Sequence, residues 1–278
     1  TVAAGAGSPT EAPRPRWDLQ PGRPDVSSFP RDAWLAATRR VLATSPPDAL
    51  GYGDSRGRRE LRRALADYLG RVRGVVATSE QIIVCAGYSQ ALAMVSWVLT
   101  ARRQRSLAFE NPSFDFHRAI ASRAGLDTPG VPVDADGIDV DEISGRAVVV
   151  TPAHQFPLGM TLAPGRRSAL AEWAHRRNGL VVEDDYDGEF RYDRQPVGAM
   201  QGLAPDRVVY AGTASKTLAP GLRISWLAVP PDLTDAVVES KGYPDAHPSA
   251  LDQLVLADLL SSGAYDRHVR QCRTRYRT

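Results

Sequence analysis

The chain is short of cysteine, lysine and long hydrophobic runs. Its two cysteines, Cys85 and Cys272, stand far apart and in no metal-binding or redox spacing, so neither a disulfide framework nor a zinc site is predicted. No apolar run approaches the length of a membrane span, and the N-terminus has no apolar core typical of a signal peptide. These absences favour a reduced, cytoplasmic protein with no membrane partner.

An excess of charge of either sign is also missing. The 34 Lys and Arg residues face 32 Asp and Glu residues, a net charge of +2, so no overall field attracts nucleic acid or a membrane. Two arginine-rich stretches, "RGRRELRR" and "RHVRQCRTRYR", could suggest contact with DNA. Both lie in helical patterns, which favours solvated helix faces instead. Only two of the basic residues are lysines, Lys216 and Lys241.

The 278 residues, 43% of them hydrophobic, suffice for one large domain or for a large and a small one. Residues 1–16 are rich in Ala, Pro and Gly without periodicity, which predicts a linker. The last residues stop within an Arg-rich helical pattern that has no capping signal. Both ends therefore lead us to expect that further segments flank this chain in the natural protein.

Short apolar runs alternate with helical patterns from about Trp34 onwards. Leu61, Leu65, Tyr68 and Leu69 share one face of a predicted helix. A helix with Pro164 at its start and Gly179 as its C-cap is expected later, and Ser249 with Asp252 would cap another. Strands are predicted in "QIIVCAG", "SLAFE", "RAVVVTP", "LVVED", "DRVVYAG" and "RISWLAV". This alternation, with continuous Val and Ile runs, predicts a three-layer α/β domain around a largely parallel sheet.

Chemically active residues follow these strands, where ligands bind in such sheets. After the first strand, Gly87 opens a helix whose free N–H groups can hold a phosphate. After "LVV" comes the acidic stretch "EDDYDGEF", which contains a tyrosine. After "VVY" comes "AGTASK", with two hydroxyls and Lys216, and Arg223 follows seven residues later.

A lysine at a strand end, beside acids and a phosphate site, can form a Schiff base with an aldehyde cofactor. Pyridoxal 5'-phosphate requires such a lysine, an anion site, an acid facing the ring nitrogen and a flat side chain over the ring. Lys216 could instead be an ordinary surface lysine, and the acids around Asp184 could hold Mg²⁺. The residues alone do not separate Asp184 from Asp185 as the functional acid.

Several segments together resemble the aminotransferase-like domain of MocR-type regulators of the GntR superfamily. They are "PGRPDVSSFPRDAW", "GYGDSRGRRELRRALADYL", "TPAHQFPLG", "VVEDDYDGEFRY" and "GTASKTLAPGLRISW". The resemblance begins near Leu19 and implies the fold of fold-type I, pyridoxal-phosphate-dependent aminotransferases. It divides the chain into the linker, an N-terminal segment (17–50), a cofactor-binding large domain (51–246) and the start of the connection to a small C-terminal domain (247–278), which is otherwise missing.

The resemblance also implies a role for individual residues. Lys216 would form the Schiff base, Asp184 would pair with the ring nitrogen, and Tyr186 would hydrogen-bond the ring oxygen. The phosphate would be held by Arg223, Thr213, Ser215 and the backbone N–H groups of Tyr88 and Ser89. Phe114 would stack on the ring, and His154 is a further candidate contact. Tyr52 would reach the phosphate of a second subunit, which requires a homodimer.

Four features depart from the pattern of the family. Phe156 of "HQFPLG" stands where most catalytic relatives carry an asparagine, and this is the form that the regulators carry. Phe116 occupies a position that is arginine in at least one regulator. The small domain that holds the carboxylate-binding arginine does not follow "RTRYRT", and no winged-helix DNA-binding domain precedes the linker.

Two functions remain open from the sequence. The first is the effector-sensing domain of a transcription regulator that binds pyridoxal 5'-phosphate and a small amine or amino acid, with DNA contacted only through an N-terminal domain outside this chain. The second is an aminotransferase, in which Lys216 would also carry the proton between substrate and cofactor. A fragment that folds partly and binds nothing is a third, weaker interpretation.

Overall fold

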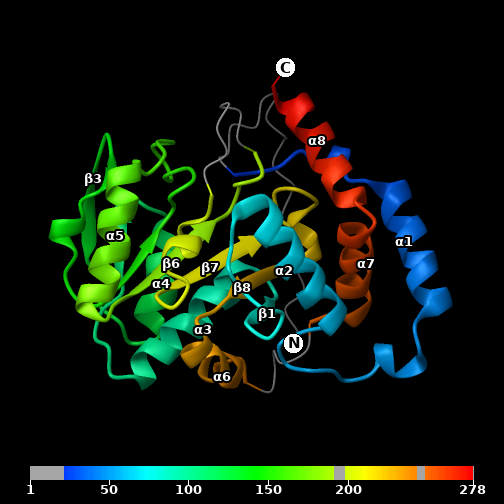
Figure 1. Cartoon of the computed structure of the whole chain (residues 1–278), viewed down its shortest axis with the longest axis horizontal. Coiled ribbons are helices and arrows are strands. Elements are labelled where there is room, and N and C mark those ends of the chain that lie inside the picture. Colours follow the sequence, from blue (N-terminus) through cyan, green and yellow to red (C-terminus); the bar gives the residue numbers. More distant parts are fainter. Residues whose placement is uncertain (1–21, 191–197, 243–247, 278) are drawn as a thin grey trace, which may run out of the picture.

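A single eight-stranded sheet forms the centre of the molecule in the computed structural model, which describes residues 22–190, 198–242 and 248–277 (Figure 1). The order across the sheet is β1-β8-β7-β6-β5-β2-β3-β4. The strands are β1 (Ile82–Cys85), β2 (Ala108–Asn111), β3 (Gly130–Asp134), β4 (Gly137–Ile138), β5 (Ala147–Val150), β6 (Leu180–Asp185), β7 (Val208–Thr213) and β8 (Ser225–Ala228).

Helices cover both faces of this sheet, as predicted for a three-layer domain. They are α1 (Arg31–Thr44), α2 (Arg59–Arg73), α3 (Tyr88–Ala101), α4 (Asp115–Arg123), α5 (Pro164–Arg177), α6 (Pro231–Ser240), α7 (Ala250–Ser261) and α8 (Ala264–Tyr276). One face is packed by α3, α4 and α6, and the other by α5, α2 and α7.

Alternation along the buried strands explains the two faces. Val149 of β5 and Val209 of β7 point into the cluster with α3, whereas Val148 and Val208 point into the cluster with α5. Successive side chains of a strand project to opposite sides. Strands with apolar residues at every position therefore suit a sheet covered on both faces, and the predicted largely parallel α/β fold is confirmed.

One inner strand runs against the others. β8 is antiparallel to both β7 and β1, while β7, β6, β5, β2 and β3 are mutually parallel. The start of β8 consequently lies at the same sheet edge as the end of β7. This brings Arg223, just before β8, next to the turn that holds Lys216.

Most of the expected elements are present with small shifts of their ends. The face of α2 that carries Leu61, Leu65 and Leu69 is buried, and Ser249 caps α7 by accepting a hydrogen bond from the Asp252 N–H. The expected C-cap of α5 was wrong. Asn178, not Gly179, adopts the left-handed conformation there, with φ 48° and ψ 44°, which asparagine tolerates better than most residues.

The N-terminal and C-terminal segments pack together beside the sheet. Ala37 and Val41 of α1 share a hydrophobic cluster with α7 and with Ile82 of β1. The boundary expected after residue 50 therefore crosses a continuous core. The boundaries after residues 16 and 246 lie outside the described residues and remain predictions.

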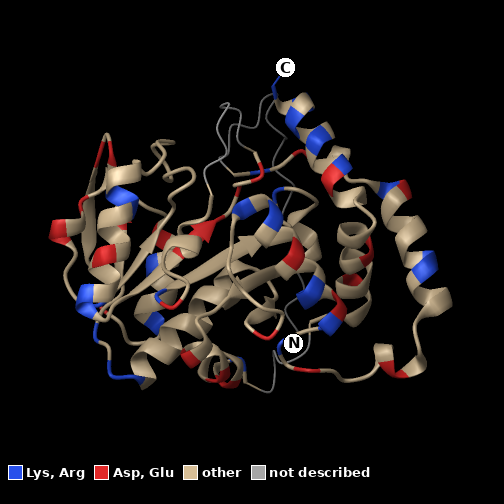
Figure 2. Cartoon of the chain, in the orientation of Figure 1, with Lys and Arg blue, Asp and Glu red and all other residues tan. Residues whose placement is uncertain are grey.

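Charged residues are distributed over the helices on the solvent side (Figure 2). Most arginines of the two basic stretches are exposed, whereas Arg62 is buried and pairs with Asp54 and Glu80. Among the helices of the described ranges, none combines the length and apolar character that crossing a bilayer requires.

Candidate functional site

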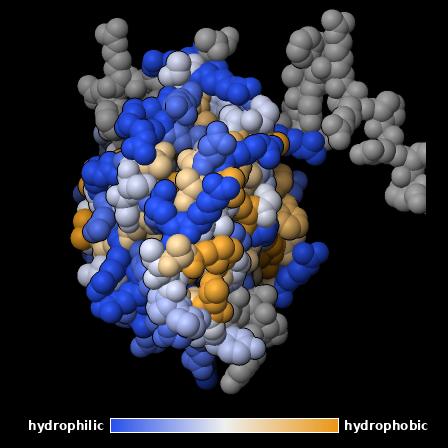
Figure 3. Space-filling model, turned by 90° about the vertical axis from the view of Figure 1, so that its right-hand side faces the viewer, coloured by the Kyte–Doolittle hydropathy of each residue, from blue (hydrophilic) through white to orange (hydrophobic). Residues whose placement is uncertain are grey.

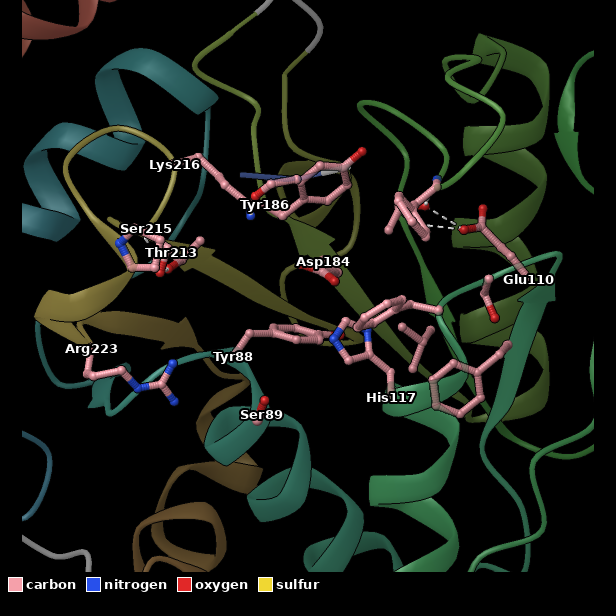
Figure 4. Close-up of a pocket in the computed structure, with 18 residues that line it drawn as sticks. Tyr88, Ser89, Glu110, His117, Asp184, Tyr186, Thr213, Ser215, Lys216 and Arg223 are labelled. Carbon is pink, nitrogen blue, oxygen red and sulfur yellow. Dashed lines mark hydrogen bonds between the residues drawn. The ribbon is translucent and has the colours of Figure 1, made fainter. Parts of the chain in front are cut away.

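A cavity of about 330 Å³ opens at the carboxyl ends of the parallel strands (Figure 4). Nine of the eleven residues singled out from the sequence belong to its wall: Tyr88, Ser89, Phe114, Asp184, Tyr186, Thr213, Ser215, Lys216 and Arg223. The lining also includes Gly22, Phe109, Glu110, Ser113, His117, Val149, Thr151, Phe156 and Pro220. These residues come from strands far apart in sequence, so the sheet topology assembles the site.

Lys216 lies in the turn that follows β7 and extends into the cavity. Its Nζ donates a hydrogen bond to the carbonyl oxygen of Gly22, in the N-terminal segment. Burial lowers the pKa of Lys216, against the opposing effect of Asp184 and Asp187. A lowered pKa increases the fraction of unprotonated amine, which is the nucleophilic form.

The other lysine has a structural environment. Lys241 is buried, and its Nζ donates to the carbonyl oxygens of Ser55 at 2.6 Å and Val84 at 2.9 Å. Of the two lysines, therefore, only Lys216 lines the cavity.

Asp184 and Asp185 lie on opposite faces of β6. Asp185 accepts from the Arg73 Nε and the Tyr210 hydroxyl, both at 2.7 Å, and is buried in the protein. Asp184 faces the cavity, and within the part of the chain that the structure describes no cationic group lies within ion-pair distance of it. Burial raises its pKa well above the ordinary range, and the neighbouring Asp185 and Asp187 raise it further. The two carboxylates therefore do not share one site.

Tyr88 lies next to this carboxylate. Its hydroxyl is buried and has no hydrogen bond of normal geometry among the described residues, although Asp184 is close enough to raise its pKa in addition to the effect of burial. A buried carboxyl group with no cationic partner among the described residues, next to a buried hydroxyl, is costly in free energy. Both groups suit a ligand with a positively charged or hydrogen-donating edge.

The opposite corner of the cavity collects anion-binding groups. The backbone N–H groups of Tyr88 and Ser89 are at the N-terminus of α3, the Thr213 and Ser215 hydroxyls are 2.9 Å apart, and Arg223 donates to the Ala86 carbonyl at 2.6 Å. Gly87 has φ 101°, and a Cβ there would lie 2.5 Å from Nη2 of Arg223. Glycine is therefore required for the guanidinium to approach the helix N-terminus.

Aromatic rings form a third wall. The Phe114 ring lies 5.7 Å from that of Phe156 and 5.1 Å from that of His117, both edge-on. Phe114 remains 48% exposed toward the opening. The Tyr186 hydroxyl donates to the carbonyl of His154 at 3.2 Å, so in this structure its ring, not its hydroxyl, faces the cavity.

Two residues singled out from the sequence do not line the cavity. His154 contacts Asp187 through Nδ1 at 3.0 Å. Tyr52 is 96% exposed and is absent from the cavity wall of its own chain. Its expected role in a second subunit stays a prediction.

The sequence analysis singled out neither Glu110 nor His117 as a site residue. Glu110 is buried and accepts from the Thr151 N–H at 3.0 Å and hydroxyl at 2.6 Å, and burial raises its pKa to about 7. It stands at the end of β2, so the rule that ligands lie beyond strand ends could have found it. Burial lowers the pKa of His117 to about 4.

Across the described ranges, no three or more His, Cys, Asp or Glu residues are grouped to hold a metal ion.

Curated relatives that match this chain are named as transcription regulators. An HTH-type regulator of Bacillus subtilis, YhdI, is 35% identical over 267 residues, which cover 95% of this chain and 56% of the relative. The probable rhizopine catabolism regulatory protein MocR of Rhizobium meliloti is 36% identical (93% and 53% covered). The pyridoxine biosynthesis regulator PdxR of Corynebacterium glutamicum is 33% identical (95% and 58%). The chain thus spans little more than half the length of these relatives.

Solved structures with this fold include aminotransferases. Kynurenine aminotransferase of Pyrococcus horikoshii, in complex with PMP, superimposes with a TM-score of 0.82 at 26% identity, over 91% of this chain and 65% of that one. Alpha-aminoadipate aminotransferase LysN of Thermus thermophilus gives 0.80 at 26% identity (91% and 66%). The model of the aminotransferase class I and II family matches residues 18–278. With the cavity at the carboxyl ends of its strands and a lysine within it, the chain belongs to the aminotransferase class I and II family.

Proposed function

We propose that this chain is the cofactor-binding, effector-sensing domain of a MocR-type transcription regulator, and that Lys216 holds pyridoxal 5'-phosphate covalently. Membership of the class I and II aminotransferase family confirms the predicted cofactor. The similarity to HTH-type regulators, at 33 to 36% identity, supports the regulatory role. Binding of DNA would belong to a part of such a regulator outside this chain.

The residues of the cavity fit this cofactor. The observation that carries the proposal is the carboxylate of Asp184, which is buried with no cationic partner in the described part of the chain, in a cavity that also contains the Lys216 amine. A protonated pyridine nitrogen would supply the missing positive charge. A second observation is the close approach of the Arg223 guanidinium to Gly87 at the N-terminus of α3. A phosphate bound there would contact both the guanidinium and the free N–H groups of the helix.

When bound, the cofactor supplies an aldehyde that joins an amine and a ring that withdraws electrons from it. The Lys216 amine, with its pKa lowered by burial, would join that aldehyde. Asp184 would keep the ring nitrogen protonated, and Arg223, Thr213 and Ser215 would hold the phosphate. Phe114 would cover one ring face, and Tyr186 would contact the ring oxygen after its hydroxyl turns from His154.

A homodimer is part of this proposal. Leu35, Leu42 and Leu50 are each about half exposed, at 49%, 55% and 53%, and belong to α1 and the short helical turn Pro47–Leu50. Figure 3 shows hydrophobic surface on the side of the molecule where α1 lies. Exposed apolar surface next to the fully exposed Tyr52 is typical of an interface, and a second subunit there would bring Tyr52 toward its partner's cavity.

Transamination is the second candidate function, because the solved structures with this fold are aminotransferases. Against it, the Arg223 side chain is the only arginine in the cavity wall formed by the described residues, and it lies at the proposed phosphate corner. A small amine or amino acid would then be an effector that the domain binds and releases.

The test is a visible spectrum of the protein with pyridoxal 5'-phosphate, before and after borohydride. The wild-type chain should gain a yellow absorbance band, and reduction should fix the cofactor to the peptide that contains Lys216. Lys216→Ala should gain neither, whereas Lys241→Arg, at the buried structural lysine, should retain both. Failure to label the Lys216 peptide would refute the proposal. Conversion of the bound cofactor to its amine form by amino acids would favour the transaminase.

A further inference from the structure

The turn that carries Lys216 is anchored on both sides of the lysine. Ala214, Thr217 and Leu218 are nearly or fully buried, and the Leu218 N–H donates to the Ala214 carbonyl at 2.9 Å. Lys216 extends from this turn into the cavity, and the neighbouring Ser215 also belongs to the cavity wall. The position of its amine therefore depends on what holds the neighbouring residues.

Helix α8 supplies two hydrogen bonds to Thr217, the residue directly after the lysine. Nε2 of His268 lies 2.6 Å from the Thr217 carbonyl oxygen, and the Tyr265 hydroxyl lies 2.7 Å from Oγ1 of Thr217. A carbonyl oxygen only accepts, so Nε2 of His268 must carry a proton. Oγ1 of Thr217 donates to the Ala214 carbonyl at 3.3 Å, which leaves Tyr265 as the donor to Thr217.

Both donors are fixed within the protein. Tyr265 is 1% exposed, and its ring meets that of Tyr68 on α2 edge-on, with centroids 5.2 Å apart. His268 is 5% exposed and has the thiol of Cys272 3.4 Å from Nε2. Burial lowers the pKa of His268, which favours the neutral ring. Neither side chain belongs to the cavity wall, so any effect on the cofactor acts through Thr217.

We propose that His268 and Tyr265 are positioning residues that set where the Lys216 amine lies in the cavity. The inference rests on the proposed function, in which this amine attacks a cofactor aldehyde. Such attack depends steeply on geometry, because a misplacement of about 1 Å can slow a reaction about a hundredfold. A donor removed from Thr217 would leave its buried carbonyl or hydroxyl to seek another partner and would shift the adjoining lysine.

The competing explanation is that α8 only adds stability, while the packing of Ala214 and Leu218 positions the turn. Under that explanation, changes in α8 lower the melting temperature but leave cofactor attachment as it is. The two explanations therefore differ in which measurement changes.

The experiment compares four variants of the full chain: His268→Ala, His268→Gln, Tyr265→Phe and, as a control, His175→Ala. His175 is a half-exposed histidine on α5 that contacts Asp206, away from the cavity. Three quantities are measured: the dissociation constant for pyridoxal 5'-phosphate, the rate at which borohydride-stable label accumulates on Lys216, and the melting temperature of the cofactor-free protein. Deuterium exchange of residues 214–218 without cofactor gives a readout independent of binding.

We expect His268→Ala to raise the dissociation constant and slow labelling by about tenfold, as loss of one buried hydrogen bond allows. His268→Gln, which can still donate from its amide, should recover most of both. Tyr265→Phe removes one oxygen and keeps the ring against Tyr68, so it should fold and should bind about threefold more weakly. Exchange at 214–218 should rise in His268→Ala and Tyr265→Phe, and His175→Ala should match the wild type.

Wild-type affinity and labelling rate in both His268→Ala and Tyr265→Phe would overturn the inference, whatever their melting temperatures. An equal defect in His268→Gln and His268→Ala would also overturn it, because the donor would then be irrelevant. A wild-type chain that takes up no cofactor would overturn the proposed function itself, a result that the variants cannot imitate.

Discussion

Asp184 and Asp185 are adjacent on β6, but their side chains lie in different environments. Asp185 is neutralised by Arg73 inside the protein, whereas Asp184 faces the cavity and has no cationic partner among the described residues. Alternation along a strand produces this separation. Their contacts therefore support the proposed functional role of Asp184 and a structural role for Asp185.

Replacing each aspartate by asparagine should separate these roles. Asp185→Asn removes the buried carboxylate charge that Arg73 contacts and should lower the free energy of unfolding by about 3 kcal/mol. Asp184→Asn should change it by less than about 1 kcal/mol, because the raised pKa already favours the neutral carboxyl. Its affinity for pyridoxal 5'-phosphate should fall at least about tenfold. Urea unfolding and cofactor titration measure both, and the reverse pattern would exclude Asp184 as the partner of the ring.

Glu110 should make the stability of the cofactor-free protein depend on pH. Burial raises its pKa to about 7 from an ordinary 4.5, so the folded protein binds a proton that the unfolded chain has released. Its contribution is present below pH 4.5, is lost as the pH rises to about 7, and then levels off. Glu110→Gln should lack this decline, which amounts to as much as about 3 kcal/mol. Urea unfolding of both proteins at pH 5 and pH 7.5 checks it, and parallel pH profiles would contradict it.

At the residue scale, the sequence located the site but not its whole wall. The rule that ligands bind beyond the ends of strands identifies Lys216, Asp184 and Arg223. Each is a charged residue next to an apolar run that predicts a strand. Gly22 lies in a segment with no strand signal. Its contact with Lys216 depends on how the N-terminal segment folds back over the sheet, which the local sequence does not predict. His117 lies inside a short helix, and its place beside Phe114 depends on packing that spacing does not encode.

The N-terminus of α3 and the start of β8 act together as one element of the site. Gly87 has φ 101° and ψ 160°, a region that essentially only glycine adopts. The missing side chain also leaves room for Arg223. The two constraints coincide at the corner proposed for the phosphate.

Gly87→Ala should therefore impair this corner beyond its cost in stability. The backbone strain should lower the free energy of unfolding by about 1–3 kcal/mol, and the displaced Arg223 should weaken binding of pyridoxal 5'-phosphate and inorganic phosphate alike. Gly74→Ala is a matched control, because Gly74 also has a positive φ, 69°, but no atom of the described residues lies within 4 Å of an added Cβ. Titration calorimetry should show weaker phosphate binding in the first variant only. Equal binding by both would remove Arg223 from the phosphate site.

Helices and long buried strands were predictable at the scale of elements, because their periodicity extends over many residues. The antiparallel direction of β8 was not, since Val and Ile runs look alike in either direction. The hairpin of β3 and β4 was also missed: β4 has two residues, too few for a pattern. At the end of α5 the rule favoured glycine, whereas Asn178 adopts the left-handed conformation one residue earlier.

At the scale of the molecule, the fold and the family could be predicted from several motifs that occur in a fixed order along the sequence. The function of the whole protein could not be predicted in the same way. Relatives named as regulators match its sequence, and structures named as aminotransferases match its fold. This chain covers only 53% of the regulator MocR and 65% of the kynurenine aminotransferase. The proposed homodimer can be tested through the cavity, because the proposal gives each cavity a residue from the second subunit.

If Tyr52 contributes to the cofactor site of the second subunit, mixing two variants that each bind the cofactor poorly should restore tight binding sites. Tyr52→Ala retains Lys216 but offers no tyrosine to its partner, and Lys216→Ala has the reverse defect. In an equal mixture that exchanges subunits freely, about half of the dimers are hybrids, each with one intact site, so about one quarter of all chains should bind tightly. Borohydride labelling of Lys216 at low cofactor concentration counts them. A chain that carries both substitutions should show no labelling of this kind. A mixture no better than its components would mean that Tyr52, 96% exposed in the single chain, stays outside the site in the dimer.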